Sequence, residues 1–320
     1  MRKVIIGIIV VVVIGIIAGI THVWQTQSSA SVGAMQTVTD STGTQVDIPT
    51  HPKRVVFLNP SNLDLFVAAG GADMIVGKPK SEAFSPEVKQ AVANVTEIGI
   101  IHSPNVEKIL SLKPDLVIGV NVPFHNQIRK TLADNGIPLY INSLDNYEDT
   151  VKTLTFFGTL TGKTDLVKQK IDELNTKVQE IEKIKQGKKS PKTLIIFSSP
   201  ASNNMATGKS FSGDILHRLG GTNIADFDTS LKGAYVPLSM EYVVKQNPDT
   251  IFIISMGTSE QMKAQLRGQM KLNSAWNQLK AVQENRVFDL PMNLFTVNPG
   301  SHIGDAMVYM ANCLYGQGGK

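Results

Sequence analysis

Hydrophobic and polar positions follow a pattern that predicts alternating strands and helices along most of the chain. Residues 53–58 (KRVVFL) predict a buried strand, 59–62 (NPSN) a turn and helix cap, and 63–71 (LDLFVAAGG) a helix that ends in glycine. Residues 73–77 (DMIVG) predict the next strand. Before them, the glycine- and aspartate-containing turn within 37–49 predicts a β-hairpin.

The same order of elements returns in the second half of the chain. Residues 191–197 (PKTLIIF) predict a strand, 210–221 (SFSGDILHRLGG) a helix that ends in glycine, and 222–226 (TNIAD) the following strand. The loop after the first of these strands is longer than in the first half. The repeated order indicates two related lobes.

A second matched pair strengthens this interpretation. Residues 105–119 and 239–254 each contain a glutamate, an apolar helix face, and Pro-Asp before an apolar strand. Glu107 precedes Pro114 by seven residues, and Glu241 precedes Pro248 by the same distance. A helix stopped by Pro-Asp before a buried strand is typical of a βα unit in a parallel sheet. Pro-Asp alone is common and chance is the alternative, but two pairs in one order favour two α/β lobes.

A long amphipathic helix is predicted between the two halves. Its apolar residues recur at helical spacing with charged residues elsewhere; they are Leu166, Val167, Ile171, Leu174, Val178, Ile181 and Ile184. An ordinary surface helix is one interpretation, and a stiff strut that keeps a cleft of nearly constant width is the other. The expected divisions are an N-terminal anchor and tether (1–36), a first lobe (37–145), the connecting helix (146–190) and a second lobe (191–320).

The N-terminus predicts export. Arg2 and Lys3 precede an uncharged run of about 20 residues, which is typical of a signal anchor or export signal. No cysteine follows the run, so a bacterial lipoprotein anchor is excluded. Small residues near 28–35 offer a cleavage site, but we favour an uncleaved membrane anchor. In either case the rest of the chain is expected outside the cytoplasm.

Composition excludes several classes of protein. The 320 residues are 42% hydrophobic and 18% charged, with a net charge of +4 and no basic stripe of the kind that binds nucleic acid. The single cysteine, Cys313, cannot form an internal disulfide and is expected in the core. No nucleophile elbow, Walker loop or HExxH motif occurs, and residues 158–164 (GTLTGKT) are too short for a phosphate-binding loop. We therefore do not expect an enzyme.

Three of these segments, 38–77, 104–119 and 239–249, together resemble the solute-binding proteins of ABC importers for iron–siderophores, haem and cobalamin. The resemblance extends over residues 38–316. It implies an α/β fold with two Rossmann-like lobes, a long rigid connecting helix and a ligand cleft between the lobes. It also implies a monomer that works with an ABC permease and its ATPase.

Within that family the chain is most similar to the haem carriers of the staphylococcal iron-regulated surface determinant type. Residues 75–79, 205–214 and 287–295 carry the likeness, together with a shared IG…PNVE spacing. Those carriers hold haem iron between a first-lobe methionine and a second-lobe histidine. The matching positions here are His102 and Met256, so the two ligand types are exchanged. Histidine with methionine is an established axial pair for haem iron.

The resemblance also implies roles for other residues. Neighbours of the haem are expected in loops that border the cleft, and propionates favour helix N-termini, hydroxyls and cations. The expected haem-pocket residues are Asn59, Ser61, Phe124, Met205, Lys209, Ser210, Tyr235, Met292 and Phe295. Loop packing is the alternative for each of them. His125 and His302 are rival iron ligands, and His217 is expected on a helix surface.

The paired glutamates have a separate implied role. Equivalent glutamates of the family dock onto permease arginines, one from each lobe, so Glu107 and Glu241 are expected to contact the permease. A solvated helix charge is the alternative. The sequence thus predicts an extracytoplasmic substrate-binding component of an ABC importer that binds haem and delivers it to a permease. A siderophore or cobalamin carrier of the same fold is the alternative, and a haem-linked enzyme is a weaker one.

Overall fold

The computed structural model describes residues 33–199, 202–255, 267–268 and 270–316. The fold lies within one compact unit, Gln36–Lys320. The predicted N-terminal membrane anchor lies outside the described residues. Among the residues that are described, no helix is both long enough and apolar enough to cross a membrane.

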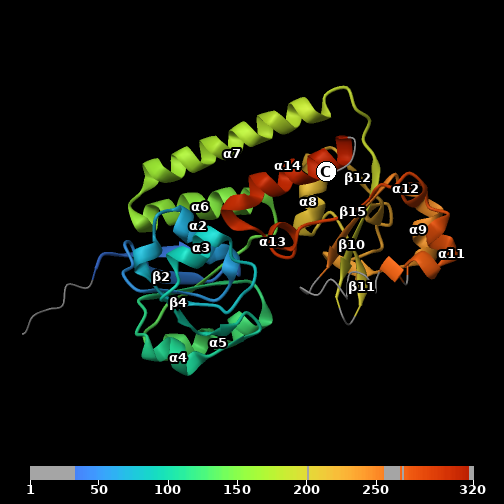
Figure 1. Cartoon of the computed structure of the whole chain (residues 1–320). Helices are drawn as coiled ribbons and strands as arrows, with labels where there is room; N and C mark the ends of the chain where they lie inside the picture. Colours follow the sequence, from blue (N-terminus) through green and yellow to red (C-terminus); the bar gives the residue numbers. More distant parts are fainter. Residues whose placement is uncertain (1–32, 200–201, 256–266, 269, 317–320) are drawn as a thin grey trace, which may run out of the picture. The chain divides into compact units, whose positions relative to one another are not determined.

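The first lobe is built on a five-stranded parallel sheet (Figure 1). Its strands, in spatial order, are β5 (Thr96–Glu97), β4 (Ile75–Lys78), β3 (Val55–Phe57), β8 (Leu116–Val120) and β9 (Leu139–Asn142). One face is covered by α2 (Pro60–Ala68), α3 (Pro86–Ala91) and α6 (Tyr147–Thr161), and the other by α4 (Val106–Ser111) and α5 (Pro123–Asp134). Val55 and Phe57 belong to the first core and Val56 to the second, because successive side chains of a strand point to opposite faces.

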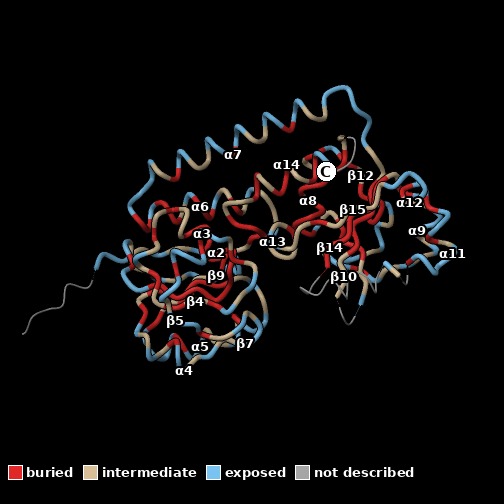
Figure 2. Tube along the Cα trace, in the orientation of Figure 1, coloured by how far each residue is buried: buried red, intermediate tan, exposed pale blue. Residues whose placement is uncertain are grey.

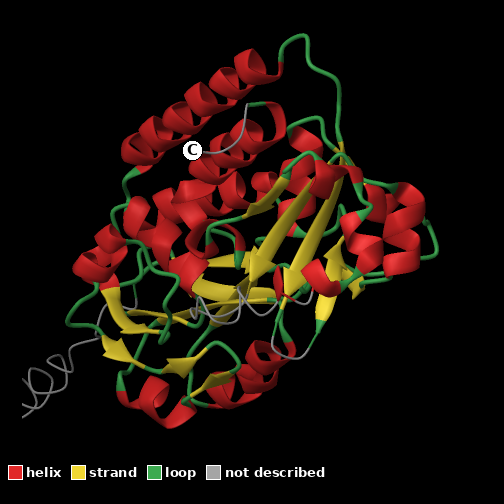
Figure 3. Cartoon of the chain, turned by 45° about the vertical axis from the view of Figure 1, so that its right-hand side comes forward, coloured by secondary structure: helices red, strands yellow, loops and turns green. Residues whose placement is uncertain are grey.

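The second lobe is built on a mixed sheet of six strands. The order is β13 (Tyr235–Pro237), β11 (Asn203–Ala206), β10 (Lys192–Ser198), β14 (Thr250–Ser255) and β15 (Val287–Asp289), with β12 (Thr222–Asn223) also beside β10. The strands β12, β14 and β15 run parallel to β10, whereas β11 is antiparallel to both β10 and β13. Figure 3 shows helices on both faces of this sheet.

The helices of the second lobe divide between these two faces. One face carries α8 (Phe211–Arg218), α14 (Ile303–Tyr315) and part of α7 (Thr164–Lys185), and the other α9 (Met240–Gln246), α11 (Ser274–Asn277) and α12 (Lys280–Gln283). Cys313 is buried on α14, which confirms its predicted place in the core. In both lobes the buried residues gather along the strands and the inward sides of the helices (Figure 2).

The repeated Pro-Asp signature has a clear structural basis. The residues before the two prolines, Lys113 and Asn247, both have a φ of 47°, a left-handed conformation that ends the helix. The aspartates then bind the start of the neighbouring parallel strand. Asp115 Oδ2 accepts the Lys53 N–H at 2.7 Å, and Asp249 Oδ2 accepts the Lys192 N–H at 2.8 Å. The predicted repeat is therefore confirmed, since each Pro-Asp sets the register of two strands.

The predicted hairpin is also confirmed, since β1 (Met35–Thr39) and β2 (Gln45–Pro49) form a two-stranded sheet. The short elements that complete the fold include the hairpin of β6 (Gly99–Ile100) and β7 (Ser103–Pro104) and the short helix α13 (Met292–Phe295). Single 3₁₀ turns are η1 (Ala72–Met74), η2 (Ile224–Asp226) and η3 (Gly300–His302).

The segment predicted as one connecting helix contains two helices. Gly162, with a φ of 69°, ends α6, and α7 begins two residues later. The helix α6 packs into the first lobe, whereas α7 takes part in both cores: Val167 packs in the first, and Leu174 and Ile181 pack in the second. Figure 1 shows α7 running past both lobes, with α6 along its first half and α14 along its second.

Candidate ligand-binding site

A cavity of about 460 Å³ lies between the loops of the two lobes. The first lobe lines it from the ends of β3, β8 and β9 and from the β6–β7 hairpin, and the second lobe from the ends of β10, β11 and β13 and from α13. Ligands of open α/β sheets bind beyond the carboxyl ends of the strands, and β3, β8, β9 and β10 all present those ends here. A volume of this size suits an organic ligand.

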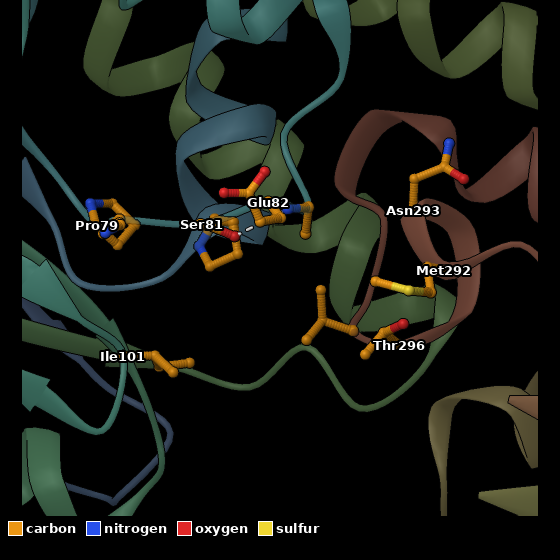
Figure 4. A pocket seen from close by; sticks show the side chains of 11 residues that line it. Pro79, Ser81, Glu82, Ile101, Met292, Asn293 and Thr296 are labelled. Atoms are coloured by element: carbon orange, nitrogen blue, oxygen red, sulfur yellow. Dashed lines mark hydrogen bonds between the residues drawn. The ribbon is translucent and has the colours of Figure 1, made fainter. Parts of the chain in front are cut away.

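A second cavity of about 480 Å³ adjoins the first and shares residues with it: Pro60, Ile101, Thr296 and Val297 line both. We call it the side bay. Pro79 and Ile101 lie on one side of the side bay, and Met292 and Thr296 lie on the other (Figure 4). Thr296 Oγ1 is buried and has no hydrogen-bond partner among the described residues. The site is thus an apolar cleft with a few polar groups.

His102 lies at the tip of the β6–β7 hairpin. The two-residue turn of Ile101 and His102 joins the paired residues Ile100 and Ser103. Gly99 has a φ of 105°, and a Cβ atom there would lie 2.5 Å from the Ser103 carbonyl oxygen, so only glycine fits. The imidazole of His102 is exposed, lines the cavity and lies edge-to-face on the Phe124 ring, with centroids 5.3 Å apart.

The rival histidines lie in different environments. His125 is fully buried, and both of its ring nitrogens contact backbone groups. Burial lowers its pKa, so it is held neutral. His302 Nδ1 lies 3.1 Å from Asp305 Oδ2 at the start of α14, outside the lining of the cavity. His217 is half exposed on α8, as predicted, and its Nε2 is 2.8 Å from Asp226.

The wall on the second lobe is aromatic. Phe197 and Tyr235 pack together with ring centroids 4.8 Å apart, and both line the cavity with Phe295. Burial of the phenol, with a smaller contribution from the Asp145 carboxylate, raises the pKa of Tyr235 and keeps it protonated. Met256 lies outside the described residues; it directly follows Ser255, the last residue of β14.

Most of the predicted pocket residues come together at this site. Asn59, Ser61, His102, Lys209, Ser210, Tyr235 and Phe295 line the cavity, Met292 lines the side bay, and Phe124 supports His102. Met205 is different: it is 2% exposed and packs in the core beneath β11, away from the cavity. Its place follows from the alternation of β11, in which Met205 points into the sheet's covered face.

Sequence reasoning did not single out several lining residues. These are Ile101, Val120, Asn121, Val122, Asn142, Ser143, Leu144, Asp145, Phe197, Phe211, Ala234, Thr296, Val297 and Asn298 among others. Half of them, residues 120–122 and 142–145, lie at or directly after the carboxyl ends of β8 and β9. Since the carboxyl ends of parallel strands meet at one edge of a sheet, strand order alone would have indicated them.

Buried amides form part of the cavity floor. The Asn62 amide nitrogen donates to Asn59 Oδ1 at 2.7 Å and to Asn142 Oδ1 at 2.8 Å, and Asn142 donates back to Asn62 Oδ1. Asn59 and Asn142 line the cavity, and both are almost fully buried. The network engages the side-chain oxygen of Asn59 and leaves its side-chain N–H groups available to a ligand.

The N-terminus of α2 is left uncapped by this network. Because Asn59 Oδ1 accepts from Asn62, it does not cap the helix. The Asn59 amide N–H groups and the backbone N–H groups of Ser61 and Asn62 have no acceptor within the described part of the chain. Donors at the start of a helix that find no acceptor in the protein are left to a ligand or to water. A helix N-terminus also favours negative charge, so the floor suits an anionic group.

The predicted serine donors, by contrast, are already used within the protein. Ser61 Oγ donates to the Asn298 carbonyl at 2.6 Å, and Ser210 Oγ donates to the Thr207 carbonyl at 2.7 Å while it caps α8. Of the described residues that line the cavity, Lys209 is the one cation besides the titratable His102, and Asp145 is the one carboxylate. The charge of the lining is therefore close to balanced.

The two glutamates of the repeat lie in matching positions. Glu107 is exposed in the first turn of α4, which Asn105 caps, and Glu241 is exposed in the first turn of α9, which Ser239 caps. Neither lines the cavity. Their carboxylates are thus free to act separately from the ligand.

Comparison with known proteins shows one consistent family. The model of the family described as "Periplasmic binding protein" matches residues 55–294. High-affinity heme uptake system protein IsdE of Staphylococcus aureus is 30% identical over 264 residues, which are 80% of this chain and 86% of that protein.

Solved structures agree with this. The crystal structure of S. aureus IsdE complexed with heme has 28% identity and a TM-score of 0.70, and the match covers 82% of this chain and 98% of that one. The catecholate-siderophore binding protein VctP of Vibrio cholerae has 18% identity and a TM-score of 0.71, over 87% of this chain and 99% of that one. The second likeness shows the two-lobed fold alone.

Proposed function

Since the chain belongs to the periplasmic binding protein family of ABC-importer substrate-binding proteins, we propose that it binds haem between its lobes and delivers it to a permease. It carries out this function outside the cytoplasm. The similar protein IsdE is described as a heme uptake protein, which supports haem as the ligand.

The observation that carries the proposal is the position of His102. Its imidazole is exposed at the tip of a short hairpin and lines an apolar cavity, across which Phe197, Tyr235 and Phe295 form an aromatic wall. Haem requires an axial ligand to its iron and an apolar slot for its ring. In this cavity His102 offers the axial ligand, and the aromatic wall offers the apolar surface for the ring.

Met256 is the proposed second axial ligand. It follows directly on β14, the central strand beside β10, at the carboxyl end where such sheets bind their ligands. The thioether would approach the iron from the second lobe while His102 approaches from the first. A methionine sulfur opposite imidazole raises the reduction potential of haem iron.

The cavity floor suits the propionates of haem. The uncapped start of α2, with the free N–H groups of Asn59, offers donors to a carboxylate, and Lys209 offers a positive charge. A ferric catecholate complex carries more negative charge than one lysine balances. The near-neutral lining therefore favours haem over such a siderophore.

We also propose that Glu107 and Glu241 dock the protein on arginines of the permease. They occupy the same position in the two lobes, and both are exposed away from the cavity. Carboxylate–guanidinium pairs give geometric specificity and speed encounter more than they add affinity. An N-terminal anchor in residues 1–36 would hold the monomeric carrier near that permease.

Absorbance titration of the full chain in detergent tests haem binding. Wild type should show a saturable Soret shift at one haem per chain. His102→Ala should weaken binding of ferric haem at least tenfold, about 1.4 kcal/mol or more. His217→Ala, an exposed histidine on α8, is the matched control and should bind as wild type. No Soret shift, with tryptophan fluorescence quenched instead by a ferric siderophore or by cobalamin, would overturn the proposal.

A further inference from the structure

The hairpin that presents His102 is too short to hold itself in place. Each of its strands contains two residues, and its tip is the two-residue turn of Ile101 and His102. Its base is tied to the end of β4, because the Ile98 N–H donates to the Lys78 carbonyl at 2.9 Å and the Lys80 N–H donates to the Gly99 carbonyl at 2.8 Å. An isolated hairpin of this size is unstable in water, so its tip needs contacts from elsewhere in the lobe.

The first turn of α5 supplies those contacts. His125 Nε2 lies 3.1 Å from the Ile101 carbonyl oxygen, and His125 Nδ1 lies 3.1 Å from the Val120 N–H. One neutral tautomer satisfies both bonds at once: Nε2–H donates to Ile101, and Nδ1 accepts from Val120. The imidazole therefore joins the end of β8 to the residue that precedes His102.

The lobe is shaped around this histidine. The His125 side chain is fully buried, and a Cβ atom at Gly119 would lie 2.9 Å from its Nδ1. The absence of a side chain at Gly119 makes the space that the imidazole fills. The adjacent residue, Phe124, contacts the ring of His102 itself. Two consecutive residues of α5 thus fix the backbone and the ring at the hairpin tip.

From this arrangement we propose that His125 is a positioning residue: its bond to the Ile101 carbonyl holds the hairpin tip so that the His102 imidazole meets the ligand in one orientation. The inference rests on the proposed function, since it concerns ligation by His102. A preorganised ligand binds more tightly because less freedom is lost on binding. Burial of His125 between the hairpin and β8 also prevents it from binding iron itself.

Two substitutions separate positioning from general damage to the fold. His125→Gln places an amide N–H near the position of Nε2 and can keep the bond to Ile101. His125→Asn places an amide oxygen near the position of Nδ1, so it can keep the bond to Val120 but loses the bond to Ile101. Leu132→Val, at a buried position on the same helix, is a control for lost stability without a change at the hairpin.

The experiment measures haem affinity and the spin state of ferric haem by absorbance and electron paramagnetic resonance, with the full chain in detergent. His125→Asn should bind haem about tenfold more weakly and show a mixture of high-spin and low-spin iron. His125→Gln should return affinity to within about threefold of wild type with one low-spin signal, and Leu132→Val should match wild type.

The outcomes distinguish the two proposals. If wild-type haem binding does not depend on His102, the proposed function is wrong. If binding depends on His102 but His125→Asn gives the wild-type spectrum and affinity, positioning by His125 is wrong. Equal losses in His125→Asn, His125→Gln and Leu132→Val would also overturn it, because they would show only a general response to lost stability.

Discussion

Asp64 accepts two hydrogen bonds from Ser301, one from its N–H and one from its hydroxyl group, and each is 2.7 Å long. Asp64 lies on α2 of the first lobe, whereas Ser301 lies in η3, after the last strand of the second lobe. Gly300, the residue before Ser301, has a φ of 62°, and a Cβ atom there would lie 2.4 Å from Asp64 Oδ1. The contact therefore ties the C-terminal segment to the first lobe and depends on glycine.

Replacement of Asp64 by asparagine should change how the stability of the protein depends on pH. Burial raises the pKa of Asp64 above its usual value of 3.8, so ionisation favours the unfolded chain. Wild type should lose stability relative to Asp64→Asn as the pH rises from the unfolded to the folded pKa, by about 1.4 kcal/mol for each pH unit in that window.

Urea unfolding at a series of pH values measures the difference. The asparagine oxygen can accept the same two bonds, so the two proteins should be nearly equally stable below the unfolded pKa. A variant that is less stable than wild type by an amount that grows with pH would show instead that the folded protein holds the carboxylate ionised.

The two proposed axial ligands, His102 and Met256, should contribute unequally to the binding of ferric haem. Imidazole is the stronger donor to ferric iron and thioether prefers the ferrous state, so Met256→Ala should retain ferric haem through His102. Its reduction potential should fall, and the open position should accept added imidazole or cyanide. Met256→His should restore six-coordination with a potential lower still. These changes are followed by spectroelectrochemistry.

The thioether–iron charge-transfer absorption at the red edge of the spectrum identifies the sulfur. It should be present in wild type and absent from Met256→Ala. Its survival in that variant would assign the bond to another methionine. Met292, which lines the side bay, would then be the next residue to replace.

The propionate carboxylates of haem should strengthen binding by accepting hydrogen bonds from donors at the start of α2. Haem dimethyl ester lacks the propionate charges, so wild type should bind it about tenfold or more weakly than haem, as expected for a lost charge-assisted hydrogen bond of about 1.5–3 kcal/mol. Asn59→Ala should narrow this gap between the affinities for haem and for its dimethyl ester, because it removes the free amide donors. Asn121→Ala, at another asparagine of the cavity lining, should leave the gap unchanged.

Permease docking should separate from ligand binding. Glu107→Lys and Glu241→Lys reverse exposed charges at the starts of α4 and α9, so haem affinity should stay close to that of wild type while haem uptake by cells falls. Glu173→Lys, an exposed change on α7, is the matched control for an altered net charge. Loss of haem binding in Glu107→Lys, with the fold intact, would contradict this division.

Local sequence signals were enough for the elements but not for their contacts. Pro114 and Pro248 predicted the paired βα units because the ends of helices and buried strands leave short-range patterns. The hydrogen bonds of Asp115 and Asp249 to the neighbouring strands were not predictable, since they join residues more than fifty positions apart. The split of the connecting segment at Gly162 was missed because α6 and α7 are both amphipathic.

The site was predicted unevenly for the same reason. His102 was singled out through the resemblance, because it occupies the position of a first-lobe iron ligand in the similar haem carriers. Nothing local showed that His125, also after a strand, turns inward to bind Ile101 and Val120, or that Asn59 gives its oxygen to Asn62. Tertiary contacts decided which polar groups face the ligand and which are used by the protein.

The shared helix α7 sets how the protein can take up and release its ligand. Any wide separation of the lobes would bend a 22-residue helix or pull Val167, Leu174 and Ile181 out of two cores, at about 25 cal/mol for each Å² of apolar surface exposed. The two lobes are therefore expected to keep nearly the same separation with and without ligand, instead of closing around it. Small-angle scattering should give one radius of gyration for the free and loaded forms. On the proposed function, release would require the permease to displace loops that line the cavity, and the His102 hairpin, with two residues in each strand, is one of these loops.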